Sequence, residues 1–215
     1  VKVSHEGVHS GMSGGTIPSS FRIQRILLDR VEDSLTGEIL IPEMHTTITD
    51  TIREQAKALA EVVGNSIWET LPVIDTLVSQ SDSVEESLLD VNWRPALTVI
   101  GADGMPSVQN AGNVLRTNTD LKLSFRIPPG IKADFVEKII KQKLETNPPF
   151  GSQVNFSLDP SADGFHAPPL EGELLQSLHD ASMHITGLPP LATWVGGTIP
   201  FMAMLGEKFP DAQFV

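Results

Sequence analysis

Residues 120–127, DLKLSFRI, alternate strictly between polar and apolar side chains. A period of two places the apolar members on one face of a β-strand and leaves the other face to water. The next segment, 128–145, has apolar residues at helical spacing, with Asp134 near its start and Lys141 nearer its end, an order that suits the helix dipole. A half-buried strand followed at once by an amphipathic helix predicts a sheet that is covered by helices on one face.

Similar signals recur along the first 160 residues. Strands are expected at 1–5, 96–105, 114–127 and 151–160, and helices at 17–31, in the acidic insert 44–95 and at 128–145. The resulting order is β-α-(helical insert)-β-β-α-β. It predicts an α+β fold, in which a two-layer, ferredoxin-like domain has a four-stranded antiparallel sheet with two helices on one face.

The pattern changes after Pro160. A loop leads to a helix that ends at Gly187, then to a Pro-rich stretch, a second apolar helix at 201–209 and the start of a strand at 212–215. This order is typical of an α/β segment, so we expect a domain boundary that separates 1–159 from 160–215. Both ends of the chain resemble interrupted strands, and we therefore expect the chain to be part of a longer protein.

Charge and composition narrow the class of partner. A net charge of −12 argues against nucleic acid and against an anionic membrane surface as partners. The chain has no cysteine, which excludes disulfides and thiolate metal ligands and is compatible with any compartment. No apolar run approaches the roughly 20 residues needed to span a bilayer. We expect a cytoplasmic protein.

The five residues GGTIP occur twice, at 14–18 and at 196–200, each time before an apolar helix. Glycine pairs allow unusual backbone conformations, threonine can cap a helix, and proline suits its first turn. The exposed N–H groups at such a helix start can also bind an anion. The flanking residues differ, so the two copies are not a duplicated unit. Each copy is either a plain helix start or a ligand-binding turn.

The order of several short motifs resembles one enzyme family along nearly the whole chain. The motifs are HSGMSGG (9–15), GEILIP (37–42), FRIPPG (125–130), NPPFGSQV (147–154) and GGTIP (196–200). They are similar to motifs of the dinuclear-zinc amidohydrolases and peptidases that include carnosinase, cytosolic nonspecific dipeptidase, aminoacylase and succinyl-diaminopimelate desuccinylase, with the carnosinase branch nearest. The resemblance implies that 1–159 is a lid and dimerisation domain and that 160–215 is part of an α/β zinc-peptidase catalytic domain.

The resemblance also implies roles for individual residues. His9 matches a histidine that reaches across a homodimer and helps to hold the reacting carbonyl oxygen in the partner's active site. Asn113 lies where the family has a polar residue near that oxygen, although the residues after it depart from the family pattern. Arg126 matches an arginine that binds the substrate carboxylate, as a planar guanidinium can. A solvated histidine and an arginine paired with a surface acid are the alternatives.

Two further elements match substrate-binding parts of the family. His166, in GFHAPP, matches a substrate-binding histidine of the carnosinase branch, and the alternative is a loop histidine without a role. Gly196, Gly197 and Thr198 match a loop that cradles the carboxylate of the substrate. The substrate implied is a small peptide or an N-acyl amino acid.

Metal ligands are not expected in this chain. The family uses two zinc ions, but its ligands precede the lid or follow the second Gly-Gly motif. Glu85-Glu86 lies at a helix start, where charge pairs usually form a solvated face. His179 and His184 are five residues apart, which does not place them on one helix face. We therefore expect this chain alone to be inactive.

The sequence supports one main hypothesis and two alternatives. The main hypothesis is part of a zinc-dependent dipeptidase or amidohydrolase that cleaves an amide bond in a small carboxylate-bearing substrate. The first alternative is a non-enzymatic ferredoxin-like module for dimerisation or small-molecule binding, and the second is an inactive family member kept as a scaffold. The role of the insert 44–95 and the substrate itself stay open.

Overall fold

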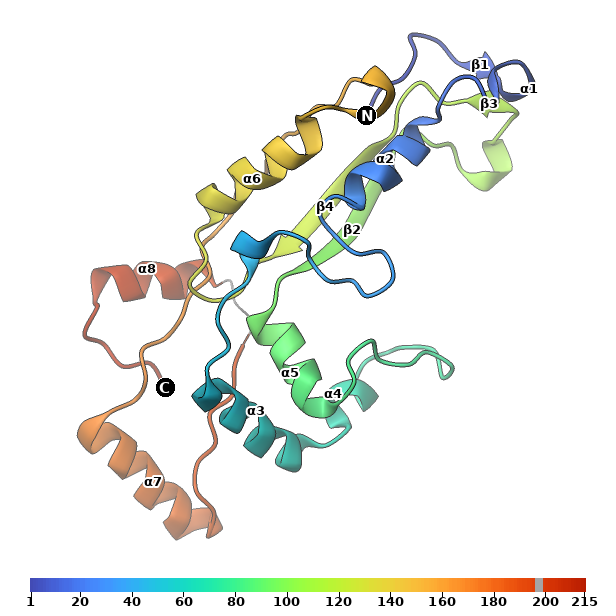
Figure 1. Ribbon diagram of the computed structural model, residues 1–215. Helices are drawn as coiled ribbons and strands as arrows, with labels where there is room; N and C mark the ends of the chain where they lie inside the picture. The colour runs from blue at the N-terminus through green and yellow to red at the C-terminus, as the bar shows by residue number, and fades with distance from the viewer. Residues whose placement is uncertain (196–198) are drawn as a thin grey trace. The chain divides into compact units, whose positions relative to one another are not determined.

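The computed structural model describes residues 1–195 and 199–215, and these form two compact units (Figure 1). The first unit comprises Val1–Met44, Ala96–Arg126 and Ala133–Ser161. The second comprises His45–Pro95, Ile127–Lys132 and Ala162–Val215. The helical insert thus groups with the residues after 161, which the order of elements along the chain did not suggest. The predicted domain boundary between 159 and 160 stays a prediction.

An antiparallel strand pair forms the sheet of the first unit. Strand β2 (Ala96–Asp103) pairs with β4 (Asp120–Arg126), from Ala96 opposite Arg126 to Asp103 opposite Asp120, with a register shift between Val99 and Gly101. Along β4 the apolar side chains are half-buried and the polar ones are exposed, which confirms the predicted alternation. The strand expected over 114–127 is interrupted, because a short β3 (Val114–Leu115) pairs instead with β1 (Val8–His9).

The outer strands of the predicted sheet are reduced to single bridges. Lys2 forms one antiparallel bridge with Asn118, just before β4, and another with Gln153. The segment around Lys2 therefore lies between the segments around Asn118 and Gln153. The expected strand 151–160 does not form a ladder, and the backbone N–H of Phe156 donates instead to Oε1 of Glu145 at 2.7 Å. The described residues thus contain two two-stranded sheets, and a four-stranded ferredoxin-like sheet stays a prediction.

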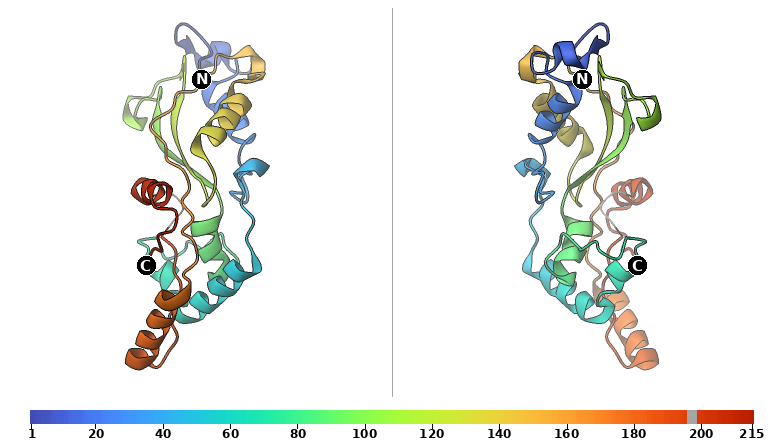
Figure 2. Two further views of the ribbon diagram at one scale, coloured as in Figure 1. Left: turned by 90° about the vertical axis from the view of Figure 1, so that its left-hand side faces the viewer. Right: turned by 90° about the vertical axis from the view of Figure 1, so that its right-hand side faces the viewer.

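Two helices cover the same face of the β2–β4 pair (Figure 2). They are α2 (Ser20–Leu28) and α6 (Ala133–Glu145), which contact each other and bury one apolar stripe each. Helix α2 begins later than the predicted 17–31 because the Ser19 hydroxyl caps it, accepting from the N–H of Arg22. Just after its other end, Arg30 donates to three carbonyls at the end of α6, those of Lys143, Thr146 and Asn147, at 2.8–2.9 Å.

The shorter helical turns of the first unit connect these elements. The 3₁₀ turns are η1 (Pro42–Met44), η2 (Val108–Asn110) and η3 (Pro149–Gly151), and α1 is a single turn (Ser10–Ser13). The core lies between the two helices and the strand pair; its fully buried side chains include Ile23, Leu27, Ile39, Ile41 and Met44. Of the predicted four-stranded sheet with two helices on one face, this unit contains two helices on one face of an antiparallel strand pair.

The second unit consists of helices joined by long loops. They are α3 (Asp50–Val63), α4 (Ser66–Glu69), α5 (Val84–Trp93), α7 (Gly172–Thr186) and α8 (Pro200–Lys208). Helix α7 ends at Gly187, which takes the left-handed conformation (φ 73°) as the sequence predicted. The strand expected at 212–215 is absent from this described segment. Among the described residues no helix is long and apolar enough to cross a membrane.

Candidate functional site

Strand pairing brings His9 and Asn113 together in the first unit. His9 is the last residue of β1 and lies opposite Val114 of β3. The next residue, Ser10, donates its N–H to the carbonyl oxygen of Asn113 at 2.8 Å, and the hydroxyl of Ser13 donates to the carbonyl oxygen of His9 at 3.1 Å. Two residues that are 104 positions apart in the sequence are therefore neighbours in a tight turn.

The imidazole of His9 is exposed and has a defined tautomer when neutral. Its Nδ1 accepts a hydrogen bond from the N–H of Gly11 at 3.1 Å, so Nε2 carries the ring proton. A Cβ at position 11 would lie 3.2 Å from both Cε1 and Nδ1 of the ring. Gly11 therefore contributes to the position of the His9 ring, a contact that the sequence analysis did not assign. An Nε2–H donor held in this way can stabilise a developing oxyanion.

Arg126 lies at the other end of the same unit. It is the last residue of β4, opposite Ala96, and its side chain is exposed. The seven residues of β4 span about 20 Å, and Figure 1 shows β1 and β3 beyond the opposite end of that strand. An extended dipeptide covers only about 7 Å. Within one copy of this unit, the length of β4 therefore separates the backbones of His9 and Arg126 by more than the length of a dipeptide.

His166 belongs to the second unit, in a segment without regular secondary structure. The loop is anchored just before it: Gly164 donates to the carbonyl of Ile131 at 3.0 Å and accepts from the N–H of Gly130 at 3.1 Å. A side chain at 164 would collide with the carbonyl oxygen of Pro128, so only glycine fits this close approach. The backbone that carries His166 is thus held against residues 128–131.

An ion pair adds to this anchor. Nζ of Lys132 lies 2.6 Å from Oδ2 of Asp163 and 3.6 Å from Oε1 of Glu207. The hydrogen bond and the negative charge of Asp163 raise the pKa of Lys132, with a smaller contribution from Glu207. Lysine 132 stays charged at neutral pH, and the loop therefore has a fixed cation at its base.

His166 also lines a hollow of about 460 Å³ within the second unit. Its walls are mainly apolar and include Phe165, Pro168 and Phe214, while Lys132 and Glu207 supply charge. An apolar hollow with a few polar groups is the usual form of a small-molecule site. The imidazole of His166 is itself exposed and packs edge-on against Trp93, with ring centroids 5.2 Å apart.

The remaining predicted site residues, Gly196, Gly197 and Thr198, lie outside the described residues. Trp194, shortly before them, makes a second edge-on contact with Trp93 at 5.8 Å. His9, Asn113 and Arg126 belong to the first unit and His166 to the second. The meeting of these groups at one substrate accordingly stays a prediction.

The described residues do not build a metal centre. Within 1–195 and 199–215, no three or more His, Asp or Glu side chains form a group that could hold a metal ion. His179 and His184 are exposed on α7, where His179 lies 3.7 Å from Asp180. The zinc chemistry that the motif order implies therefore does not fit these residues.

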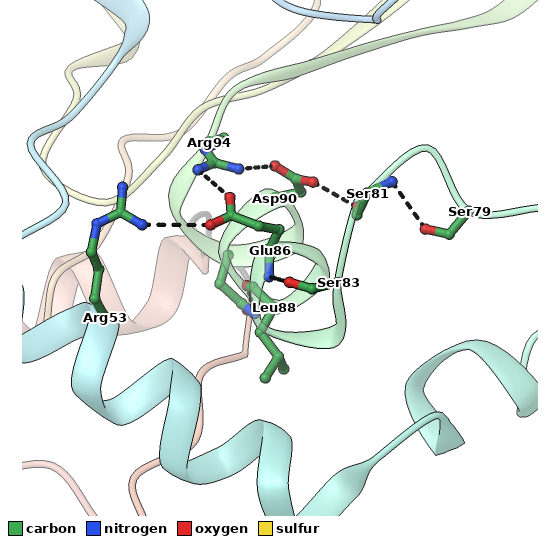
Figure 3. Close-up of polar contacts among 9 residues, drawn as sticks. Arg53, Ser79, Ser81, Ser83, Glu86, Leu88, Asp90 and Arg94 are labelled. Atoms are coloured by element: carbon green, nitrogen blue, oxygen red, sulfur yellow. Dashed lines mark hydrogen bonds and ion pairs between the residues drawn. The ribbon is translucent and has the colours of Figure 1, made fainter.

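The pair Glu85-Glu86 lies at a helix start, as predicted, where both residues are half-buried and Glu86 is part of an ion-pair network. Figure 3 shows Glu86 between two arginines: Nη2 of Arg94 lies 2.6 Å from Oε2, and Nη1 of Arg53 lies 3.5 Å from Oε1. Partial burial acts to lower the pKa of Arg94, but its hydrogen bonds and charge interactions with Asp90 and Glu86 raise it above the ordinary value. Glu86 has a structural role in joining α3 to α5.

Two characterised dipeptidases are similar to this chain in sequence. No protein-family model matches the chain. It is 27% identical to a cysteinylglycine-S-conjugate dipeptidase of Corynebacterium striatum, over 96% of this chain and 44% of the relative. It is 25% identical to the Cys-Gly metallodipeptidase DUG1 of Saccharomyces cerevisiae, over 90% of this chain and 40% of the relative. The chain thus spans less than half the length of the curated relatives it matches.

Solved structures agree with these relatives on the fold. Human carnosine dipeptidase 1 superposes with a TM-score of 0.69 at 23% identity, over 96% of this chain and 44% of that structure. An M20 family metallo-carboxypeptidase of Sulfolobus solfataricus superposes with a TM-score of 0.65 at 15% identity, over 95% and 52%. The fold is thus one found in metallopeptidases. The chain is thus similar in sequence to two dipeptidases and in fold to metallopeptidases, in agreement with the resemblance of its motif order.

Proposed function

We propose that this chain is the lid and part of the catalytic domain of a zinc-dependent dipeptidase, which hydrolyses the amide bond of a small substrate bearing a carboxylate. The observation that carries the proposal is the similarity to two dipeptidases along at least 90% of the chain. The zinc ligands would have to lie outside the described residues. Both relatives are named for cysteinylglycine or its conjugates, so a dipeptide is the first substrate to test.

The roles proposed for single residues follow from their chemistry. His9 would donate Nε2–H to the oxygen of the reacting carbonyl, with Asn113 beside it. Arg126 would pair with the substrate carboxylate, as would the loop 196–198, and His166 would contact the bound dipeptide. What supports the role of His9 is its exposure on a tight turn and a tautomer that leaves the Nε2 proton available.

We further propose that the enzyme is a homodimer and that His9 acts on the substrate of its partner. What supports this is the length of β4, which separates the backbones of His9 and Arg126 of one copy by more than the length of a dipeptide. In a symmetric dimer, His9 of each copy would reach the substrate that is bound by Arg126 of the other copy.

The test is turnover of cysteinylglycine by the full-length protein supplied with zinc. We expect His9→Ala to lower kcat roughly a hundredfold to a thousandfold, as the loss of an oxyanion donor does. His5→Ala is the matched control, since His5 is also exposed and lies only four residues away. Equal turnover by the His9→Ala variant and the wild type would disprove the role of His9. If the wild type binds the dipeptide without metal and never cleaves it, the protein is a binding module instead.

A further inference from the structure

The indole of Trp93 is a rigid part of the helical insert. It is the last residue of α5, only 4% exposed, and packs in a small core with Ile52, Ala56 and Leu89. Its Nε1–H is buried and finds no acceptor among the described residues. A side chain that is enclosed in this way has little freedom to reorient.

The end of α5 that carries Trp93 is fastened by an ion-pair network. Arg94, the next residue, binds Asp90 at 2.5 Å and Glu86 at 2.6 Å, and Arg53 links the same network to α3 (Figure 3). The hydroxyl of Ser81 donates to the other oxygen of Asp90 at 2.6 Å. Helices α3 and α5 therefore form one support for the indole.

Two segments that are distant in sequence rest on this indole. The rings of His166 and Trp194 both meet Trp93 at 90°, with centroids 5.2 and 5.8 Å away. Within the described part of the chain the imidazole of His166 has no hydrogen-bond partner. The edge-on contact with Trp93 is thus the interaction that orients this exposed ring.

We propose that Trp93 is a positioning residue for substrate binding. It holds the imidazole of His166 in place, and the insert 44–95 supports Trp93. The inference rests on the proposed dipeptidase function. Trp93 touches no reacting atom in this scheme and acts through His166. Its loss would therefore weaken binding of the dipeptide more than it would slow the chemical step.

The experiment compares three variants of the full-length protein in cysteinylglycine hydrolysis. Trp93→Leu removes the ring, Trp93→Phe keeps an aromatic edge, and Trp68→Phe is the control in the same insert, without a ring contact among the described residues. We expect Trp93→Leu to raise KM roughly three- to tenfold, the worth of one aromatic pair, with kcat within about twofold of the wild type. Trp93→Phe should restore KM, and Trp68→Phe should leave it unchanged.

If Trp93→Leu does not fold, the fluorescence of Trp93 in a protein that keeps this residue tests the inference instead. In full-length protein carrying Trp68→Phe and Trp194→Phe, with any tryptophan outside these 215 residues also replaced by Phe, Trp93 is the sole tryptophan. We expect its fluorescence to change with His166→Ala and on addition of cysteinylglycine. Unchanged fluorescence in both cases, or an unchanged KM in a folded Trp93→Leu variant of an active enzyme, overturns the inference alone. A wild type that does not cleave the dipeptide with zinc overturns the proposed function and the inference with it.

Discussion

At the scale of single residues, the site around His9 depends on a neighbour without a side chain. The ring packs so closely on the backbone of Gly11 that Nδ1 accepts its N–H at 3.1 Å. This hydrogen bond selects the Nε2–H tautomer, and with it the donor that the proposed reaction uses. A histidine in a looser turn would have no such selection.

We predict that Gly11→Ala lowers kcat for cysteinylglycine by about tenfold, because its Cβ would lie 3.2 Å from two ring atoms and would turn the imidazole. Gly112→Ala is the control, since a Cβ there meets nothing within 4 Å. Steady-state kinetics on both variants check this prediction. If both variants keep wild-type kcat, the orientation of His9 does not depend on Gly11.

At the scale of elements, the turn that follows α2 is organised by one carboxylate. Oδ1 of Asp33 accepts from the N–H groups of Leu35 and Thr36 at 2.9 and 2.8 Å and from the hydroxyl of Thr36 at 3.0 Å. The backbone hydrogen bond from Thr36, then that from Leu35, lower the pKa of Asp33 below its ordinary value of 3.8. The turn thus favours the charged carboxylate.

A carboxyl group whose pKa is lowered on folding stabilises the fold fully above its unfolded pKa, and this contribution is lost as the pH falls through the folded pKa. We therefore predict that the amide of Thr36 loses protection from hydrogen exchange below pH 3.8, the ordinary pKa of Asp33. NMR-detected exchange from pH 6 to pH 2 measures this. In Asp33→Asn, whose amide oxygen accepts hydrogen bonds without titrating, this pH dependence of exchange should vanish. If it persists, a group other than Asp33 causes the loss of protection at Thr36.

At the scale of the whole molecule, the central issue is how many copies make one site. The length of β4 separates His9 from Arg126 within one copy, while His166 lies in the other compact unit. The separation along β4 supports the proposal that a second copy completes the site. They also suggest a test that needs no structure of the dimer.

We predict that mixing His9→Ala protein, which is impaired in kcat, with His166→Ala protein, which is impaired in binding the dipeptide, restores activity at a cysteinylglycine concentration well below KM. Random exchange of subunits makes half of the dimers mixed, and in each of these one site has both histidines, so about a quarter of wild-type turnover should return. Unmixed proteins at equal total concentration are the controls. No recovery after subunit exchange has been verified by mass would show that His9 serves its own copy.

What the sequence alone determined is local. The alternation of 120–126 and the Gly187 terminus of α7 formed as predicted, and the amphipathic helix expected over 128–145 formed as α6 from Ala133 onward. Each depends on side chains within a few residues of one another. The motif order likewise predicted the family that the comparisons then supported.

Only the tertiary structure decided which distant residues meet. Asn113 came beside His9 through the pairing of two-residue strands, and Trp93 came beside His166 through packing of the insert. The expected strand 151–160 failed to form a ladder, and Glu145 took its Phe156 amide instead. Such outcomes depend on competition among partners that lie far apart in the chain, and a local pattern of side chains contains no information about that competition.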